Sequence, residues 1–434
     1  MFENLTVMVV LITIALCATT ALLSHMGAAV FHDGIRPVIP EFIESRMKRP
    51  ELLSIAFGLS VGFIASVGIA HTMATGLLNP WLLFLTTDIL GIMAPKKWMA
   101  LLLGGLWGLL SLTALAGINT VLTGLPVDLI GGIATLGDPV VTGFALFPIV
   151  AVFKQFGKKS GFITVISAVI IRQITTLINP AMIDAMTMLT GIVILVGCAI
   201  YKDFKAKSTS VENNEVDVFS ERIGRIKKNL PFLMLAGALI ALVSNIGIFG
   251  GSEVSIYTLA EAQRAYSDQA AQQLVNQAAL AEFMRGLGFI PLIATTAITT
   301  GVYGVAGLTF VYVVGYLAPH PIIALIGGAI IIFIEVNVLG FFGKGLSKFQ
   351  SIRDASENIR SSMTTVMEFA LLIGAINACI VMGGNTGFFI GAAIYLINEL
   401  TGRKVMRMAI GPVAAIATGI ILNILYVLGL FSLM

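Results

Sequence analysis

The chain has 434 residues, of which 57% are hydrophobic and only 11% are charged, and its formal net charge is +3. Soluble domains carry about 25% charged residues. The composition therefore excludes a soluble globular protein and indicates a polytopic membrane protein embedded in a lipid bilayer. The small positive charge comes from short loops, as membrane orientation requires, and implies no nucleic-acid partner.

Motifs of catalysis and of metal binding are absent from the sequence. Cys17, Cys198 and Cys379 lie singly in apolar runs without CxxC spacing, which argues against a metal, a redox pair or a disulfide. We find no nucleophile elbow, no HExxH and no nucleotide-binding loop. The sequence thus predicts no enzyme, no catalytic residue, no metal and no cofactor.

Apolar runs long enough to cross the bilayer follow one another along the chain. A helix rises 1.5 Å per residue, so about 20 residues cross the hydrocarbon core. The fold class we predict is all-α, with about twelve transmembrane helices. The expected spans cover residues 5–30, 54–75, 78–93, 99–122, 139–156, 161–179 and 182–201, then 231–249, 321–342, 362–383, 385–400 and 408–432, with a broken region at 287–318.

A hydrophilic linker divides the chain into two membrane halves. We expect an N-terminal half at 1–201, a cytoplasmic linker at 202–230 with an amphipathic helix around Val218–Lys228, and a C-terminal half at 231–434. Seven spans before the linker would give the halves opposite orientations, as inverted-repeat transporters need. Similarity between the halves is faint: a short span opened by Asn79-Pro80 corresponds to one opened by Pro291. Two alternatives therefore stay open, halves that are inverted repeats and halves that are not.

The stretch Asn276–Gly304 joins a polar helix, expected at 252–286, to the broken region 287–318. Gly286, Gly288 and Pro291 should interrupt the helix. The basic loops all lie on the cytoplasmic side only if the chain re-enters near Leu287 and returns by Pro319. We therefore predict a re-entrant hairpin with its tip at Thr300–Gly304. The alternative is one long tilted helix.

Charged residues within apolar segments are costly and are functional candidates. Asp88 stands beside Thr86 and Thr87, and this cluster could bind a polyol, a cation or a proton. The alternative is that Asp88 lies near the membrane interface and caps or pairs locally. Glu335, within IIIFIEVNVLG, is the candidate for proton coupling together with Asp88. Arg172 and Asp184 flank a turn and are expected to pair with each other.

Arg285 is the candidate for contacting an anionic group of a substrate, helped by a helix N-terminus near Gly288–Pro291. Glu282, Thr295 and Thr296 complete this expected binding site, which Asp88 would face. The alternative is an ion pair between Glu282 and Arg285, three residues apart on one helix face, that only ties the helix to the bundle.

The motif HDGIRP forms a compact polar corner after the first span. Its residues His32, Asp33 and Arg36 suit an inner gate or a structural clamp. One His and one Asp do not make a metal site.

The runs FHDGIRPVIP, SIAFGLSVGFIASVGI, LLNPWLLFLTTDILG, GSEVSIYTL and NQAALAEFMRGLGFIPLIATTAITTGVYGVAGLTFVYVVGYL resemble the YhfT family of bacterial inner-membrane proteins, and the resemblance runs nearly end to end. It implies a multi-pass protein of the bacterial inner membrane, a transport role and a small polar metabolite as substrate. The layout is also similar, more loosely, to the membrane components of phosphotransferase systems of the ascorbate and galactitol type, which dimerise.

The leading hypothesis is a secondary transporter of a small polar or anionic metabolite that works by alternating access as a homodimer. A second hypothesis is the membrane component of a phosphotransferase-type uptake system for a sugar or polyol, which would need a soluble phosphotransferase partner. A third is a non-transporting membrane scaffold or sensor.

Overall fold

Helices make up nearly all of the fold in the computed structural model, which describes residues 6–205, 213–307, 309–346 and 350–432. Two strands of two residues each accompany them, β1 (Ala29–Val30) and β2 (Tyr303–Gly304). The helices are α1 Val7–His25, α2 Ile39–Ile43, α3 Arg49–Phe63, α4 Ile69–Thr75, α5 Pro80–Met93, α6 Lys97–Thr123, α7 Leu129–Ala134, α8 Gly137–Ile178, α9 Ile183–Lys205, α10 Asn213–Lys228, α11 Leu230–Asn245, α12 Ile256–Gln263, α13 Asp268–Thr300, α14 Phe310–Leu317, α15 Pro321–Leu346, α16 Gln350–Leu400 and α17 Arg407–Val427.

The all-α class is confirmed, and in the described part of the chain 7 helices are long and apolar enough to cross a membrane, or 8 if the bent pair 221–228 and 230–245 forms one span. This is fewer than the expected number. Two physical features explain the difference. Helices α5 and α14 are too short to cross alone, and α8 and α16 each run through two expected spans.

Both of these long helices break at glycine. In α8 the backbone of Gly157 has φ 79°, and in α16 that of Gly384 has φ 54°. Residues other than glycine rarely adopt these values. The breaks lie where the sequence analysis separated 139–156 from 161–179 and 362–383 from 385–400. Each long helix therefore consists of two arms.

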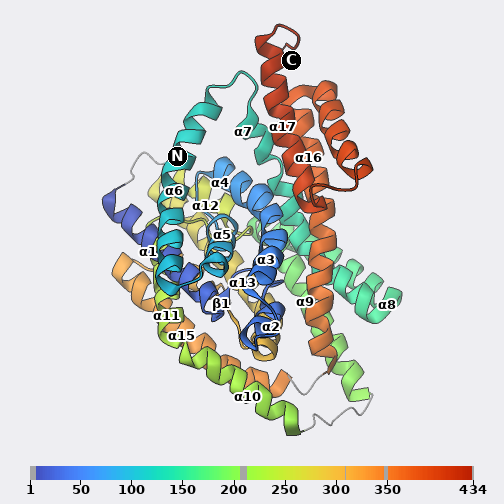
Figure 1. The fold of residues 1–434 in the computed structure, drawn as a ribbon. Coiled ribbons are helices and arrows are strands. Elements are labelled where there is room, and N and C mark those ends of the chain that lie inside the picture. Colours follow the sequence, from blue (N-terminus) through green and yellow to red (C-terminus); the bar gives the residue numbers. More distant parts are fainter. Residues whose placement is uncertain (1–5, 206–212, 308, 347–349, 433–434) are drawn as a thin grey trace.

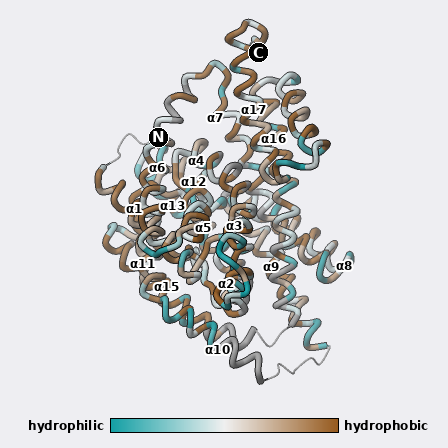
Figure 2. Tube along the Cα trace, viewed as in Figure 1, coloured by the Kyte–Doolittle hydropathy of each residue, from teal (hydrophilic) through white to brown (hydrophobic). Residues whose placement is uncertain are grey.

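Hydrophobic residues predominate along most helices, as in a protein that faces lipid (Figure 2). Large side chains on the second arms of α8 and α16 are exposed, among them Leu177, Ile178, Phe389 and Leu400. Hydrophilic colour gathers on α10, the amphipathic helix expected in the linker. Exposed apolar surface of this extent is not tolerated in water, so the chain is a membrane protein.

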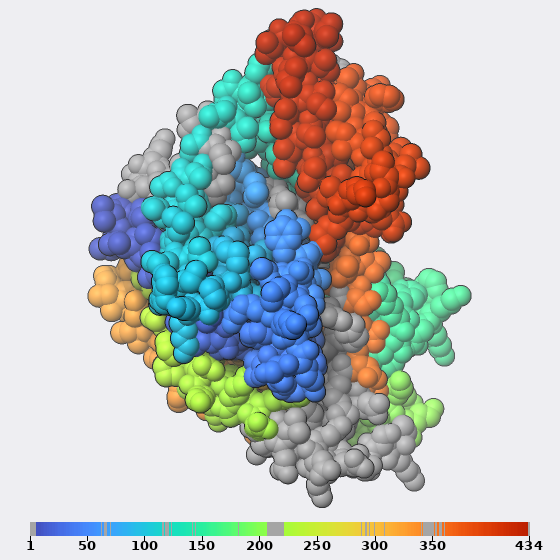
Figure 3. All heavy atoms as spheres, viewed as in Figure 1, coloured from blue at the N-terminus to red at the C-terminus, as the bar shows by residue number. Residues whose placement is uncertain are grey.

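The helices form two packed groups (Figures 1 and 3). In the first, α1 packs against α5 and α6, and α11 packs against α14 and α15. In the second, α8 packs against α9 and α16, and α16 packs against α17. Helix α13 contacts members of both groups, including α14, α15, α9 and α16. The long α13 therefore lies at the junction between the groups.

The segments that follow α1, α4, α11 and α13 pair with one another two by two. Strand β1 pairs in parallel with β2, with Ala29 opposite Tyr303. A second parallel bridge joins Leu78 to Phe249. Buried non-helical backbone must find hydrogen-bond partners within the protein, and these crossings supply them.

The helix ends at the crossings have matching caps. Gly27, Gly76, Gly247 and Gly301 all have φ between 60° and 77°, which ends a helix in the left-handed conformation. Thr75 and Thr300 make the same two hydrogen bonds: each hydroxyl donates to the carbonyl four residues earlier, and each accepts from the amide two residues later.

Two sequence motifs recur at these equivalent places. The motif ALxSxxG ends α1 at residues 21–27 and ends α11 at residues 241–247. The motif GxxAPxxxxALxxG joins α5 to α6 at residues 91–104 and joins α14 to α15 at residues 315–328. In both copies its first glycine packs against the backbone of the preceding long helix, Gly91 on Ala21 and Gly315 on Ala241. Local sequence and tertiary contact therefore recur together.

The second group shows the same correspondence. The breaks of α8 and α16 lie in GKKSGF (157–162) and GGNTGF (383–388). Gly161 packs against Phe153 in α8, and Gly387 packs against the carbonyl of Cys379 in α16. Motifs and glycine contacts found in α1–α9 thus recur in α11–α17, with α10 between the two segments.

The region around Asn276–Gly304 differs from expectation in one respect. The predicted interruption at Gly286, Gly288 and Pro291 is wrong, because α13 continues to Thr300. Neighbouring helices can compensate for the backbone hydrogen bond that proline removes from a membrane helix. The expected polar helix 252–286 is instead α12 and the start of α13, separated at Arg264–Ser267. Helix α13 ends at Thr300, beside the predicted tip, and α14, which follows β2, packs on α13.

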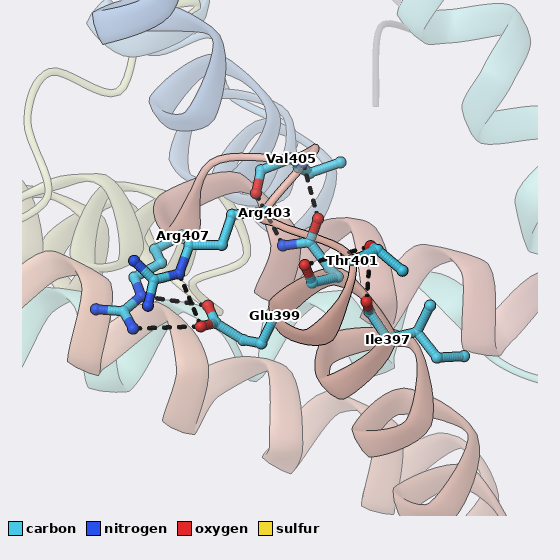
Figure 4. Close-up of polar contacts among 7 residues, drawn as sticks. Ile397, Glu399, Thr401, Arg403, Val405 and Arg407 are labelled. Atoms are coloured by element: carbon cyan, nitrogen blue, oxygen red, sulfur yellow. Dashed lines mark hydrogen bonds and ion pairs between the residues drawn. The ribbon is translucent and has the colours of Figure 1, made fainter.

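The turn between α16 and α17 is closed by polar contacts at its surface (Figure 4). Glu399 accepts hydrogen bonds from Arg403 Nε at 2.8 Å and Arg407 Nε at 3.2 Å. Asn398 bonds both the amide and the carbonyl of Val405. These arginines lie away from the centre of the molecule and serve below as control positions.

Candidate functional site

A pocket with a volume of about 90 Å³ lies where β1 and β2 cross, between the first group and α16. One water needs roughly 10–15 Å³ by this measure, so the space suits a small molecule. Its walls come from both copies of the repeated arrangement. The lining residues are Phe31, His32, Asp33, Gly34, Arg36, Phe63, Trp81, Arg285, Phe289, Ile293, Gly304, Val305, Ala306, Gly307, Thr309, Met363 and Thr364.

Arg36 is the most unusual residue of this pocket. Its side chain is 4% exposed, and Nη2 lies 3.0 Å from Asp33 Oδ1. Its Nε and Nη1 atoms are buried and have no hydrogen-bond partner among the described residues. A buried arginine donates up to five hydrogen bonds, and leaving donors unpaired costs free energy. The two free donors therefore define a place for an acceptor.

Gly304 leaves room for the guanidinium of Arg36 because it has no side chain. A β-carbon at Gly304 would clash with Nη2 of Arg36. Because Gly304 belongs to β2 and Arg36 follows β1, the strand crossing itself brings the guanidinium into the pocket. His32, Asp33 and Arg36, expected to form a gate or a clamp, thus line the pocket directly.

Arg285 enters the pocket from α13. Its Nε donates to Glu253 Oε1 at 2.7 Å, and its guanidinium stacks on Phe289 at 4.4 Å. The carboxylate of Glu253 is fully buried. The ion pair of Arg285 with Glu282, which the sequence analysis held as the alternative, is not formed: the partner of Arg285 comes from the loop before α12.

Glu282 instead anchors that loop. Its Oε1 accepts from Ser252 N at 2.8 Å, Ser252 Oγ at 2.6 Å and Ser255 Oγ at 2.7 Å. The loop it fixes carries Glu253, the partner of Arg285. Glu282 is absent from the pocket lining, so its effect on the pocket passes through Glu253.

Asp88 fixes the segment that follows β1, as Glu282 fixes the loop before α12. It is fully buried, and it accepts from Ser24 Oγ at 2.6 Å, Phe31 N at 2.8 Å and His32 N at 3.0 Å. We had expected Asp88 to face Arg285 across the binding site, but Asp88 does not line the pocket. Since Phe31 and His32 do line the pocket, Asp88 positions them.

The threonines of the predicted site are mostly used within helices. Thr86 donates to Leu82 O, and Thr87 donates to Phe84 O and bonds Thr20. Thr296 is buried but does not line the pocket. The side chain of Thr295 lies outside the described residues.

Glu335 lies behind the pocket. It is 4% exposed and accepts a short hydrogen bond from the hydroxyl of Tyr303 in β2, at 2.5 Å. It also packs against Gly307, where a β-carbon would clash with its Oε2. Gly307 lines the pocket, so this carboxyl group contacts the backbone that forms one wall.

Thr309 closes the pocket at the start of α14. Its φ is 69°, which is strained for a β-branched residue. Its hydroxyl is buried without a partner among the described residues. Strain and an unpaired polar group at one position are typical of functional sites. The N-terminus of α14 beside it adds a positive dipole end.

An apolar wall covers the remainder of the pocket. Phe63 stacks on Trp81 with ring centroids 4.9 Å apart, and Phe31 meets the edge of Trp81 at 5.4 Å. Phe289 extends the wall from α13. Such a surface favours the apolar part of a ligand.

Sequence reasoning missed Glu253, Gly304 and Thr309. The motif GSEVS around Glu253 contains a signal, because an acidic residue follows the ALxSxxG motif at the same spacing as Asp33 does. Gly304 and Thr309 gave no signal of their own, since their roles depend on the crossing of distant segments.

The arrangement offers groups that can bind a small ligand. Among the described residues, no group of three or more His, Cys, Asp or Glu side chains could hold a metal ion. What the pocket offers is two arginines, one unpaired hydroxyl and an apolar wall.

Fold and pocket together define an all-α membrane protein whose buried pocket lies at the crossing of two repeated helix arrangements. The chain belongs to the YhfT family, described as a protein of unknown function, whose profile matches residues 8–431. It is 52% identical over 428 residues to the uncharacterized protein YhfT of Escherichia coli (strain K12), covering 97% of this chain and 98% of the relative. No solved structure matches.

Proposed function

We propose that the protein is a secondary transporter of a small polar or anionic metabolite, and that the pocket at the β1–β2 crossing binds the substrate. The observation that carries this proposal is a buried pocket with unpaired arginine donors at the centre of a membrane protein. Intramembrane charge is retained where function needs it.

The recurrence of ALxSxxG and GxxAPxxxxALxxG supports two inverted repeats. With an odd number of spans in α1–α9 and a cytoplasmic α10, the second copy would run with opposite orientation. Counting each arm of α8 and α16 as a span, and the short helices as partial crossings, brings the number close to the expected twelve or so. The turn from α13 through β2 to α14 would then be re-entrant.

Two packed groups support alternating access. The group that contains β1 and β2 would move against α8, α9, α16 and α17, carrying the pocket from one side of the membrane to the other. Met363 and Thr364 of α16 line the pocket and would separate from it during this motion. A homodimer in the bacterial inner membrane belongs to the same proposal, with the exposed second arms of α8 and α16 as the contact between copies.

Transport is tested with the full chain in proteoliposomes. Vesicles are incubated with a mixture of small organic acids, sugars and polyols, and the accumulated compounds are identified by mass spectrometry. We expect saturable accumulation of unmodified substrate by wild type and by Arg403→Gln, and loss in Arg36→Gln. Accumulation no higher than in protein-free vesicles overturns the proposal.

The same experiment separates the alternatives. A phosphotransferase component would bind substrate yet accumulate it only with a phosphate-donating partner and in phosphorylated form. A scaffold or sensor would accumulate nothing. Uptake of unmodified substrate by the chain alone therefore excludes both.

A further inference from the structure

The pocket contains several buried donor atoms without a partner among the described residues. Arg36 Nε and Nη1 are buried and unpaired, and the Thr309 hydroxyl is also free to donate. Arg285 adds a second guanidinium, whose Nε alone is used by Glu253. Donors that stay unpaired in a buried site are matched by an acceptor-rich group of a ligand.

Charge in the lining points the same way. Among the described residues, the charged side chains that line the pocket are those of Asp33, Arg36 and Arg285. The charge of Arg285 is balanced by Glu253, which lies outside the lining. Asp33 lies at ion-pair distance from Arg36 but its Oδ1 makes no aligned hydrogen bond among the described residues. Asp33 therefore offsets part of the charge of Arg36 without occupying its free donors.

The start of α14 also favours a negatively charged ligand. Thr309 is the residue before the helix and makes no side-chain cap, so the first amides of α14 lack that partner. Helix N-termini favour anions through these amides and through the helix dipole. Guanidinium groups form paired hydrogen bonds with carboxylate and phosphate oxygens.

The rest of the lining excludes a fully hydrophilic ligand. Phe31, Phe63, Trp81 and Phe289 face the same space as the arginines. A hydroxyl-rich sugar would leave its polar groups without partners on that wall, which costs free energy.

We propose, as a refinement that rests on the transport function above, that the pocket binds a small organic anion with one carboxylate or phosphate group on a mainly apolar body. The anionic group pairs with Arg36 and with the Thr309 hydroxyl beside the α14 N-terminus. Arg285, paired through Nε with Glu253, adds the remaining donors of its guanidinium. The apolar body lies against Phe63, Trp81 and Phe289.

Binding is measured by titration calorimetry on the purified full chain in detergent, without any gradient. The probes are benzoate, phenyl phosphate, benzamide, acetate and inorganic phosphate. We expect benzoate or phenyl phosphate to bind at least about tenfold more tightly than benzamide, because charge-assisted hydrogen bonds are lost in the amide. The same probe should exceed acetate or inorganic phosphate by at least about tenfold, because burying the ring adds to affinity.

Variants locate the binding. Arg36→Gln should weaken the tighter probe by about tenfold or more, and Arg403→Gln, which removes an exposed arginine of an ion pair, should leave it unchanged. Thr309→Gly should not destabilise the fold, because glycine adopts φ 69° without strain. It removes the hydroxyl and should weaken binding several-fold while thermal stability is kept.

Several outcomes overturn the proposal. They are equal binding of benzamide, equal binding of acetate or inorganic phosphate, absence of binding by both aromatic anions, and unchanged binding in both Arg36→Gln and Thr309→Gly. The transport proposal fails separately: anion binding without any uptake in vesicles overturns transport alone, and uptake of neutral compounds only overturns the anion assignment alone.

Discussion

Gly104 of α6 packs directly against the carbonyl oxygen of Cys17 in α1, so closely that a β-carbon would not fit between them. Gly328 of α15 has the same relationship to Gly237 in α11. Both glycines end the GxxAPxxxxALxxG motif. Small residues at such contacts let membrane helices approach closely.

Alanine at either glycine should therefore separate the two helices. We expect Gly104→Ala and Gly328→Ala each to lower the free energy of unfolding by about 1–3 kcal/mol through overpacking. Thermal denaturation in detergent measures this. Gly117→Ala in α6 is the matched control, because a β-carbon there meets nothing within 4 Å. Equal effects of all three variants would contradict the close contact.

Asp88 should matter for stability and for the pocket without contacting the ligand. Asp88→Ala leaves the amides of Phe31 and His32 without their acceptor, and each unpaired buried group costs about 1–3 kcal/mol. The Ser24 hydroxyl keeps Thr20 O as an acceptor at 3.1 Å. Asp88→Asn keeps one acceptor oxygen and should cost less. Unfolding in denaturant measures the order, with Glu261→Ala, an exposed carboxylate, as control. If Asn is as damaging as Ala, the negative charge is needed for more than these bonds.

The buried pair of Arg285 and Glu253 gives a third prediction. Removing one partner leaves an uncompensated buried charge, which costs about 3–5 kcal/mol. We expect Glu253→Gln and Arg285→Met to be strongly destabilising alone, and the double variant to be more stable than the sum predicts. Denaturation midpoints of the four proteins give the coupling energy. Additive effects would mean that the two side chains act independently.

Sequence reasoning succeeded for local features and failed for long-range ones. The break at Gly157 was predictable because lysines flank it, whereas the continuity of α13 through Pro291 depends on neighbours that the sequence does not show. The spacing of Glu282 and Arg285 on one helix favoured their pairing, yet Glu253, in a distant loop, is the partner.

The site shows the same limit. HDGIRP was recognisable as a polar corner because charged residues are rare in this chain. Its place beside Arg285 follows from the pairing of Ala29 with Tyr303, which no local pattern encodes. The repeated motifs were visible in the sequence but consist mostly of small and apolar residues, which recur by chance in membrane helices.

Glu335 provides the test of proton coupling. Its carboxyl group bonds Tyr303 and packs on Gly307, so a change in its protonation would alter the contacts of the pocket wall. Glu335→Gln mimics the protonated form. If protons drive transport, wild-type uptake should rise with an inwardly directed proton gradient, whereas the variant should lose that stimulation and keep exchange of substrate across the membrane. Uptake and counterflow in proteoliposomes measure both, with the exposed Glu261→Gln as control. A variant that responds to the gradient as wild type does would remove Glu335 from the coupling step, because glutamine cannot release a proton at this site.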